Sequence, residues 1–526
     1  MSEESSKIEK CQSTPADQES LHAGVLKGTV QDYDDDAILR ANGHDAVLPR
    51  QFNWISALGL GFSITNSWIG YLSCFGQNLT YGGAQACIFS LIVAFIIQLT
   101  VTVGLAELGS AFPSSGGQYH FCYILSADRT KGYTAYLVGW LSVLAWWIVT
   151  CSGISLASLV LNGIVNFCIP GYVANQWQTY LTYVAVSLIT ILPVFAVSSR
   201  ISLVAQAALY LSLAGYLIFF IVSLAMHQQT QPGSFVVASG QGNSGWGQGT
   251  AWMLAVSNAM YAFGGTDGAV IHICEEIPRP ARRVPQVMIM TMIIGLITCL
   301  SLFIVLMFFI SDMDAVRTSP LPSLEVIHQV TGSRSVTLGL FILLFVVYLS
   351  CLPSQWVSSG RIAWAFARDN GFPFSTFFSK VSNRLNFPVH TTVAAFIFSC
   401  LYGLLYLAST TAFNSIITSA VLFLNITYTV PQGLLLIRGR DSLPARYLRL
   451  GYLGWYCNIF SVMWIFVLCV LICMPPNLPV ELGSMNYVSV ILVGVVVIIN
   501  LLWVCIGRYS FEGPRIDWDA LRADAN

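Results

Sequence analysis

The sequence predicts an all-α integral membrane protein with twelve transmembrane helices, and two observations support this prediction. Of the 526 residues, 55% are hydrophobic and only 9% are charged, against about 25% charged residues in an average soluble domain. Apolar runs long enough to cross a bilayer recur along the whole chain, which excludes a soluble domain with one anchor. Windows of about 20 residues place the spans near 52–73, 82–106, 134–163, 178–197, 201–225, 250–271, 286–310, 336–360, 389–407, 412–437, 453–473 and 485–506.

The positions of Lys and Arg orient these spans. If the N-terminus is cytoplasmic, 22 of the 24 basic residues fall in cytoplasmic loops or tails, and only Arg317 and Arg334 fall outside. Cytoplasmic loops retain positive charge, and an error of one span would destroy this asymmetry. We therefore expect a multi-pass protein with both termini in the cytoplasm. A twelve-helix domain over 51–507 would lie between an N-terminal tail, 1–50, and a C-terminal tail, 508–526.

Composition also excludes several classes of function. The net charge of −1 gives no reason to expect a nucleic-acid partner, and the 14 cysteines are scattered through apolar runs without metal-site spacing. The seven histidines are widely separated, and no HExxH or GxxxxGK[ST] motif occurs. We therefore expect neither an enzyme nor a chain that hydrolyses ATP itself, and no metal or cofactor.

The segments before and after the first span carry two further expectations. The tail up to residue 50 is polar and acidic and lacks a signal sequence, so the first span would act as the targeting signal. Its stretch "QDYDDDAILRANGHDA" is typical of a solvated, largely disordered arm. The tripeptide "NLT" places Asn78 in the first outer loop, where it would be either a glycosylation acceptor or an unmodified loop residue.

Two spans contain residues that interrupt a helix. The first span reads "SALGLGFSITNSWIG" over 56–70, and the sixth reads "SNAMYAFGGTDGAVIH" over 257–272, both with glycines and small polar residues in mid-membrane. They occupy corresponding positions if the chain contains two five-helix units, which is typical of a transporter's binding site. The backbone groups freed there can hold a small zwitterion or cation. The alternative is that these small residues permit close helix packing.

Asp267 lies in the sixth of these spans, where a charge is costly unless it faces a polar cavity. Three roles are open to this carboxylate. It could pair with a substrate ammonium, carry a coupling proton, or accept hydrogen bonds from the backbone N–H groups of an unwound helix.

Four motifs resemble those of one transporter superfamily. They are "GLGFSITNSW" in the first span, "AELGSAFPSSGGQY" at 106–119, "AFGGTDGAVIHICEEIPRPARRVPQ" at 262–286, and "RIAWAFARDNGFP" at 361–373. In order and spacing they resemble the amino acid, polyamine and organocation superfamily, specifically its fungal amino acid and choline branch, with GABA and choline permeases. The likeness spreads from about Asp34 to Arg508.

The resemblance implies a fold and a site. The fold would be LeuT-type, with inverted repeats over about 51–225 and 250–437 and two extra helices over about 453–506. The site would lie at the midplane and work by alternating access, with Phe263 as an aromatic gate. The substrate-binding residues implied are Gly59, Gly61, Ser63 and Asn66 in the first span, and Phe263, Gly264, Gly265, Thr266 and Asp267 in the sixth.

The first span departs from the family pattern, because "FSITNSW" lacks the dense glycine run with which many amino acid permeases hold a carboxylate. This leaves room for an amine such as choline or GABA. Five aromatic residues could face a quaternary ammonium, although membrane aromatics more often pack or anchor: Trp68, Tyr71, Trp146, Trp147 and Tyr261.

Charged residues near the cytoplasmic face are candidates for an inner gate. Glu107 closes the second span, where a gate or loop contact is expected. Glu275 and Glu276 are candidates for ion pairs with neighbouring charges, although a solvated loop is an alternative. The expected gate residues are Glu107, Glu275, Glu276, Arg361, Arg368 and Asp369.

These observations predict a secondary transporter that imports amino acids or related amines across a lipid bilayer. By resemblance we expect proton coupling, and no acidic residue in the eighth span favours sodium instead. The resemblance also implies a fungal plasma membrane. Three alternatives remain at this point. They are a choline or GABA-like amine permease, a nutrient sensor that binds without transporting, and an intracellular location.

Overall fold

The computed structural model describes residues 35–517, apart from 36, 38, 44–47, 170, 269–272, 409, 482–484 and 515; the side chains of 408 and 410–417 also lie outside the description. The predicted disorder of residues 1–34 and the C-terminal tail from 518 onward therefore lie outside the described residues.

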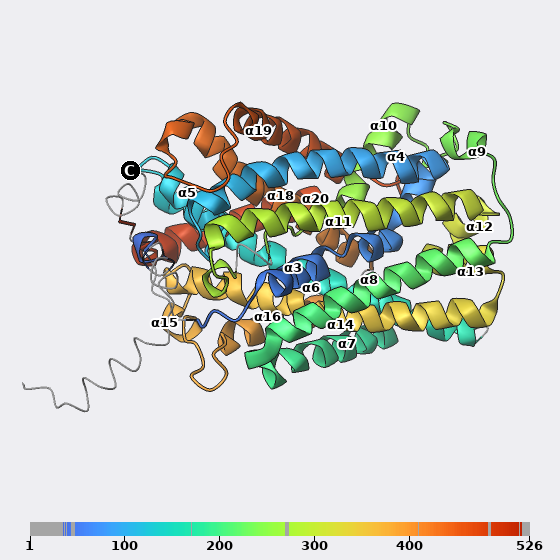
Figure 1. Ribbon diagram of the computed structural model, residues 1–526, viewed down its shortest axis with the longest axis horizontal. Coiled ribbons are helices and arrows are strands. Elements are labelled where there is room, and N and C mark those ends of the chain that lie inside the picture. Colours follow the sequence, from blue (N-terminus) through green and yellow to red (C-terminus); the bar gives the residue numbers. More distant parts are fainter. Residues whose placement is uncertain are drawn as a thin grey trace, which may run out of the picture.

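Within the described ranges the chain is helical, with no strand and one isolated bridge between Ser382 and Phe387. The helices run side by side along the long axis of the molecule (Figure 1). Ten stretches of the described residues are long and apolar enough to cross a membrane, so this is an all-helical membrane protein. They are Trp54–Ala111, which holds α3 (Trp54–Thr65) and α4 (Ser67–Ala111), α6 (Lys131–Cys168), α7 (Gln176–Ala196), Ser198–Met226 with α8 (Ile201–Met226), α11 (Pro280–Phe309), α14 (Arg334–Arg368), Val389–Leu407 with α16 (Val389–Gly403), Thr418–Arg438 in α18 (Thr410–Arg438), α19 (Tyr452–Cys473), and Val488–Ser510 with α20 (Val488–Leu502).

The first of these stretches has 58 residues, more than one crossing needs. Its α4 part is bent at Gly82 (φ −160°, ψ 16°) and Gly83 (φ 72°, ψ −155°). The positive φ of Gly83 suits glycine, and a Cβ there would lie 2.5 Å from the Gln241 side chain. Helix α4 is thus divided into two helical segments, 67–81 before the bend and 84–111 after it.

The sixth predicted span is not one of the ten, because its helix is short. Helix α10 (Gln248–Ala259) passes into a 3-10 turn, η2 (Met260–Phe263), and the backbone then leaves helical geometry. Gly264 is extended, at φ −76° and ψ 160°, and Gly265 has φ 74°. Regular helix therefore stops at the glycine pair, before Asp267.

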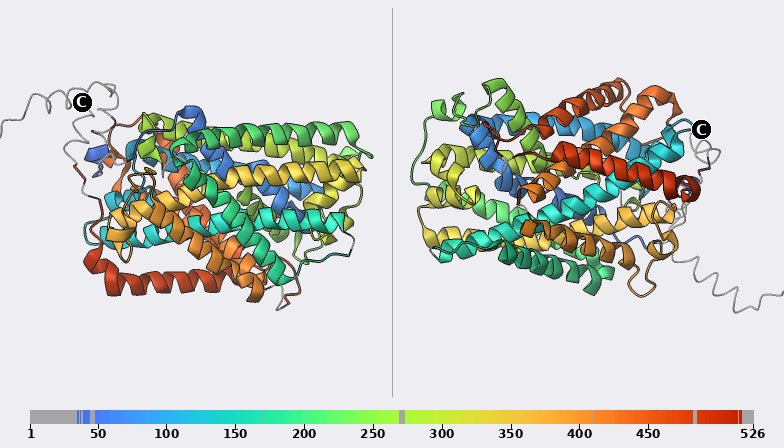
Figure 2. Two further views of the ribbon diagram at one scale, coloured as in Figure 1. Left: turned by 90° about the horizontal axis from the view of Figure 1, so that it is seen from below. Right: turned by 180° about the vertical axis from the view of Figure 1, so that it is seen from behind.

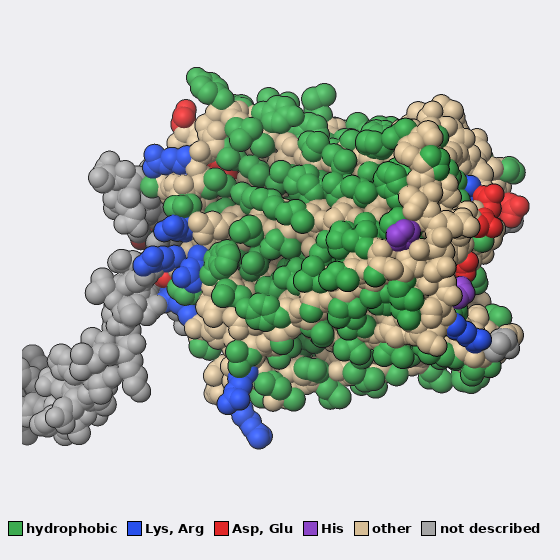
Figure 3. All heavy atoms as spheres, turned by 45° about the vertical axis from the view of Figure 1, so that its right-hand side comes forward, with side chains coloured by type: hydrophobic (Ala, Val, Ile, Leu, Met, Phe, Trp, Pro, Cys, Tyr) green, Lys and Arg blue, Asp and Glu red, His purple; other side chains and the backbone are tan. Residues whose placement is uncertain are grey.

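Positive charge gathers at one end of the bundle (Figure 3). We call this the basic end; α3 and α11 begin there, and α14 and α18 end there (Figures 1 and 2). The C-terminal helix α20, red in Figure 2, lies on the outside of the bundle and buries only Val488 and Ile499.

Part of the predicted disordered arm is folded onto the basic end, which corrects that expectation for residues 35 and 39–43. Leu39 and Ala41 are buried. An Asp35 carboxylate oxygen accepts the Arg279 N–H at 2.9 Å, and the Asn42 carbonyl lies 3.0 Å from His120 Nε2. Two apolar side chains thus find a surface to bury against, which a count of acidic residues cannot show.

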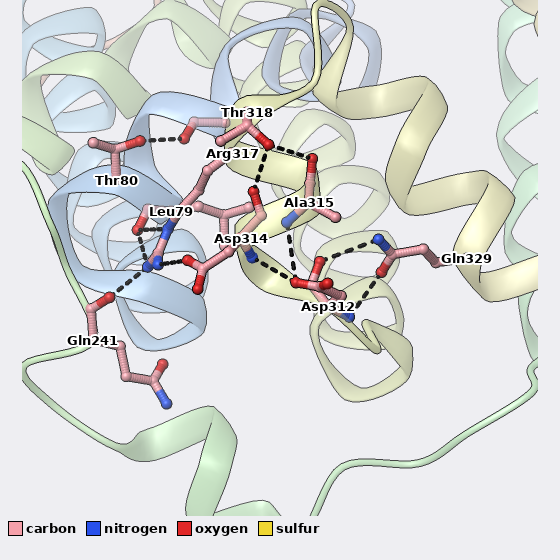
Figure 4. Close-up of polar contacts among 10 residues, drawn as sticks. Leu79, Thr80, Gln241, Asp312, Asp314, Ala315, Arg317, Thr318 and Gln329 are labelled. Carbon is pink, nitrogen blue, oxygen red and sulfur yellow. Dashed lines mark hydrogen bonds and ion pairs between the residues drawn. The ribbon is translucent and has the colours of Figure 1, made fainter.

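At the opposite end, Arg317 joins three segments (Figure 4). Its guanidinium donates to the Leu79 carbonyl at 2.7 Å and also to the Gln241 carbonyl. It pairs with Asp314 at 2.7 Å within α12 (Met313–Thr318), whose N-terminus is capped by Asp312. The first segment of α4, the loop before α10 and α12 are therefore held together beside the bend of α4.

Candidate functional site

A cavity lies between the two interrupted segments. It is bounded by the end of α3, the start of α4, the turn after η2, and the helices α6, α14 and α18. Its lining includes Ser63, Thr65, Asn66, Ser152, Tyr261, Gly264, Gly265, Tyr348, Gln355 and Leu424.

The first interruption is a left-handed residue. Helix α3 ends because Asn66 adopts φ 31° and ψ 59°, a conformation that asparagine tolerates better than most residues. The Asn66 side chain is also fixed, because its Oδ1 accepts the Ser212 hydroxyl at 2.9 Å and its Nδ2 lies 3.3 Å from Cys351 Sγ. Contacts to α8 and α14 thus hold the break open.

The cavity lining is uncharged, since no Asp, Glu, Lys or Arg belongs to it among the described residues. Two of its polar atoms, Thr65 Oγ1 and Gln355 Oε1, are buried without a hydrogen-bond partner in the described part of the chain. Leaving such an atom unpaired costs about 1–3 kcal/mol. The site can therefore gain from a ligand that brings hydrogen-bonding groups.

The sixth-span turn is held from four sides just beyond the cavity. The Asp267 carboxylate accepts from Gln118 in α5 (Gln118–Leu125), from the Tyr428 hydroxyl in α18, and from Trp146 Nε1 at 3.4 Å. The neighbouring Thr266 hydroxyl lies 3.1 Å from that of Thr102 in α4. Asp267 is fully buried and connects elements that are distant in sequence.

Glycine is required where Trp146 covers this turn. A Cβ on Gly268 would lie 1.8 Å from the indole, and one on Gly265 would lie 3.2 Å from both Trp146 and Ile64. The Gly268 carbonyl also accepts the Ser358 hydroxyl of α14 at 2.8 Å. The glycines thus allow an aromatic ring to lie directly on the backbone.

Of the predicted binding residues, the structure brings only some to the cavity. Ser63, Asn66, Gly264 and Gly265 line it. Gly59, Gly61, Phe263, Thr266 and Asp267 do not belong to the lining of this cavity.

Three of these residues make local packing contacts instead. A Cβ on Gly59 would lie 2.6 Å from the Ala205 carbonyl of α8, so this glycine permits close helix packing, and Gly61 is buried in the same helix. The Phe263 ring packs edge-on against Phe95 of α4 at 5.5 Å between centroids. Phe263 is fully buried in this contact.

Sequence reasoning missed Ser152, Tyr348 and Gln355. Each lies within α6 or α14, away from the two interrupted spans, so no glycine pair marks it. Of the five aromatic candidates, only Tyr261 lines the cavity.

A second cavity leads from the site toward the opposite end. It is shaped partly by Ser73, Asn258 and Arg317, and it shares Ser152, Leu156, Tyr261 and Val421 with the central cavity. The Ser152 and Tyr261 hydroxyls lie 2.6 Å apart at this junction. This hydrogen bond lies between two of the four residues that line both cavities.

Ion pairs close the basic end, and they include the predicted partners. Arg361 Nε lies 2.6 Å from Glu276 Oε1, and Arg368 donates twice to Glu275 at 3.0 Å. Asp369 accepts the Tyr119 hydroxyl at 2.9 Å. All three carboxylates are buried.

Burial and charge act oppositely on two of these carboxyl groups. Burial raises the pKa of Glu275, but the charge and hydrogen bonds of Arg368 and the hydrogen bonds of Ser115 together lower it by more, so the net pKa lies below its ordinary value. Burial dominates at Asp369 and raises its pKa to about 6, although Arg368 and Tyr119 act in the other direction.

Glu107 makes a loop contact, one of its two expected roles. Its carboxylate pairs with Arg446 at 2.8 Å and with Arg440, and it accepts the Leu450 N–H at 3.3 Å. It thereby fixes the segment between α18 and α19.

The prediction that Asn78 is a glycosylation acceptor in an outer loop is wrong. Asn78 lies inside α4 and is fully buried. Its Nδ2 donates to the Tyr71 hydroxyl at 2.7 Å and to Ser90 at 3.0 Å, and its Oδ1 accepts from Asn258 at 2.8 Å. The acceptor tripeptide arises here in a packed helix, where an enzyme cannot reach it.

Helices interrupted around an uncharged cavity, open toward one end and closed by ion pairs at the other, define a small-molecule transporter of the membrane. The sequence model of the amino acid permease family matches residues 52–497, so the chain belongs to this family. It is therefore a transporter-family protein and not an enzyme, and the predicted resemblance is confirmed.

Several relatives extend this likeness over most of the chain. It is 29% identical over 489 residues to the choline transporter of Saccharomyces cerevisiae, covering 92% of this chain and 86% of that protein. It is 27% identical over 522 residues to the swainsonine transporter swnT of Arthroderma benhamiae, covering 95% and 99%. It is 24% identical over 498 residues to the amino-acid permease BAT1 of Arabidopsis thaliana, covering 90% and 95%.

Proposed function

We propose that this protein imports an amino acid or a related amine together with protons, by alternating access. The observation that carries the proposal is the uncharged cavity between two interrupted helices, which connects toward one end and is closed by buried ion pairs at the other. Such a geometry exposes a site to one side of a membrane at a time.

The proposed arrangement has twelve crossings. The bend at Gly82 and Gly83 turns the 58-residue stretch into two of them, and α10 with η2 supplies the sixth. Family membership supports a LeuT-type pair of five-helix repeats, with α19 and α20 in addition. The basic end is then cytoplasmic, as are both termini, and the plasma membrane is the proposed location.

The cavity supports a substrate that carries hydrogen-bonding groups. Thr65 and Gln355 offer unpaired polar atoms, and Tyr261 and Tyr348 offer aromatic faces to an ammonium group. An amino acid or a primary amine uses both features. Choline, the alternative favoured by one relative, would use the aromatic faces and only one hydroxyl.

Asp267 is the proposed carrier of the coupling proton. Its place outside the cavity lining argues against direct pairing with the substrate, while its bond to Tyr428 connects it to a helix that does line the cavity. A change of protonation at Asp267 would alter that bond. The structural role of an anchor for the turn remains the competing hypothesis.

Uptake into proteoliposomes tests the proposed function. Choline, GABA, and neutral, basic and acidic amino acids would each be supplied with and without an inward proton gradient. At least one primary amine should accumulate only with the gradient. Binding without accumulation of any compound would favour a sensor and overturn the proposal.

Two variants connect uptake to the cavity. Thr65→Val and Gln355→Leu should each raise the KM of the transported substrate by roughly tenfold, the value of a hydrogen bond to a charged group. Thr100→Val is the matched control, because its hydroxyl bonds only the Ile96 carbonyl on an exposed part of α4.

A further inference from the structure

Three arginines line a separate cavity at the basic end. Arg279, Arg282 and Arg283 surround it together with Trp54, the first residue of α3, and Gln286 of α11. None of these residues belongs to the central cavity.

Two of the three arginines, Arg282 and Arg283, carry charge without a carboxylate partner in the described part of the chain, while the Arg279 N–H bonds the Asp35 carboxylate. Arg282 and Arg283 form no ion pair with any described residue, and Arg282 instead lies 5.1 Å above the Tyr447 ring. This differs from Arg361, Arg368, Arg440 and Arg446, all of which face a carboxylate. A dianionic or monoanionic group would therefore find donors on Arg282 and Arg283.

The same face of α11 continues as an exposed apolar stripe. Residues 279, 282, 283 and 286 recur at helical spacing with Met290, Ile293 and Ile297, which are 37%, 41% and 61% exposed. In a membrane protein such a stripe faces lipid tails. Trp54 lies at the boundary, where aromatic residues anchor at the headgroup level.

The geometry points to a binding site for one anionic phospholipid, with the headgroup phosphate at Arg282 and Arg283 and an acyl chain along the α11 stripe. A soluble phosphate would use the arginines but would leave the stripe without a role, so the stripe favours the lipid. Basic pockets between membrane helices on the cytoplasmic side bind such headgroups. The leaflet rests on the proposed orientation, in which the basic end is cytoplasmic.

The test is a lipid titration of the purified full-length protein. After delipidation, phosphatidylserine or phosphatidylcholine is added and bound lipids are counted by native mass spectrometry. Arg282→Gln/Arg283→Gln should weaken phosphatidylserine binding by about tenfold or more, since each basic residue contributes about 1 kcal/mol at an anionic surface. Arg282→Lys/Arg283→Lys keeps the charge and should retain most of the binding.

The matched control is Lys380→Gln/Arg384→Gln, which removes two exposed charges from the same end. It should change binding by less than about twofold. Equal loss in both double variants would overturn the proposal, as would full displacement of the lipid by millimolar inorganic phosphate. If the double variant does not fold, the single variants Arg282→Gln and Arg283→Gln carry the test. Because binding is measured without transport, its failure is separate from failure of the proposed function.

Discussion

Arg361 and Glu276 form an ion pair in which both side chains are almost fully buried, with 0% and 1% of their surfaces exposed. Gln51, just before α3, donates to the same carboxylate at 2.9 Å, and the Phe52 N–H donates to the Glu276 carbonyl at 3.2 Å. The pair therefore joins the start of the first span to the segment after the sixth-span turn and to α14.

Glu276→Gln should open the basic end, because it leaves the Arg361 charge buried without a partner. Removing one member of a buried pair costs about 3–5 kcal/mol. The thiol of Cys274 is 2% exposed, so its rate of alkylation reports the opening. Asp128→Asn, which breaks the exposed Lys131 pair, is the control and should leave the rate unchanged. An unaltered rate in Glu276→Gln would contradict a gating role.

Asp267→Asn should preserve substrate affinity within about tenfold, because Asn keeps hydrogen bonding and the residue lies outside the cavity lining. Accumulation against a gradient and its pH dependence should be lost while exchange continues. Binding and pH-dependent accumulation are measured on the same variant. An affinity loss of roughly 30-fold or more would indicate direct pairing with the substrate, as expected for a broken desolvated charge pair. If both properties stay near wild type, a functional Asp267 is excluded.

Gly265→Ala should abolish uptake while Gly264→Ala is tolerated. Gly265 has φ 74°, where a Cβ costs about 1–2 kcal/mol and would also press on Trp146 and Ile64. Gly264 has φ −76°, and a Cβ there would meet its nearest neighbour at 3.7 Å. Initial uptake rates are compared at equal surface expression. Similar rates for the two variants would show that the turn conformation is not needed.

Asp369→Asn should stabilise the protein at pH 7 and have little effect at pH 4. Burial raises the pKa of this carboxyl to about 6, above its ordinary value of 3.8. Its protonated form is therefore favoured by folding, and this contribution is lost as the pH rises from about 4 through 6. Thermal unfolding at both pH values measures the difference, which is a few kcal/mol at most. Glu275 acts in the opposite direction, since its pKa is lowered, so Glu275→Gln should instead destabilise at pH 7.

The two ends of α6 test the orientation. Cys168 at its end is exposed, and Asp128 just before its start is 97% exposed. In intact cells an impermeant thiol reagent should label Cys168 and should not label a cysteine in Asp128→Cys. Labelling at both positions would exclude the proposed topology.

Sequence reasoning found features that depend on local composition. The glycine pair at 264–265 predicted where the helix stops, and charges beside one another in the 275–276 and 361–369 segments predicted the ion pairs at the basic end. These properties depend on residues that are close together in the chain, so they can be predicted from one sequence.

Features that depend on how distant helices meet were not predictable in this way. Tyr348 and Gln355 line the cavity only because α14 packs against the first-span break, and Asn78 is buried because α4 and α10 lie together. Gly59 resembles a binding glycine in sequence, but α8 lies against it in space. In each case the outcome depends on which helix packs against the residue, and no local sequence pattern encodes this.

An uncharged cavity lining has an electrical consequence. A site without fixed charge can reorient empty without moving charge across the membrane, while the loaded step moves the charge of its cargo. Each elementary charge contributes about 2.3 kcal/mol per 100 mV, enough for roughly 50-fold accumulation. If Asp267 carries the proton, the empty carrier without that proton is the charged form. The return of the empty carrier, and not the loaded step, then moves charge across the membrane. The voltage dependence of inward current and of carrier return therefore shows which step bears the charge.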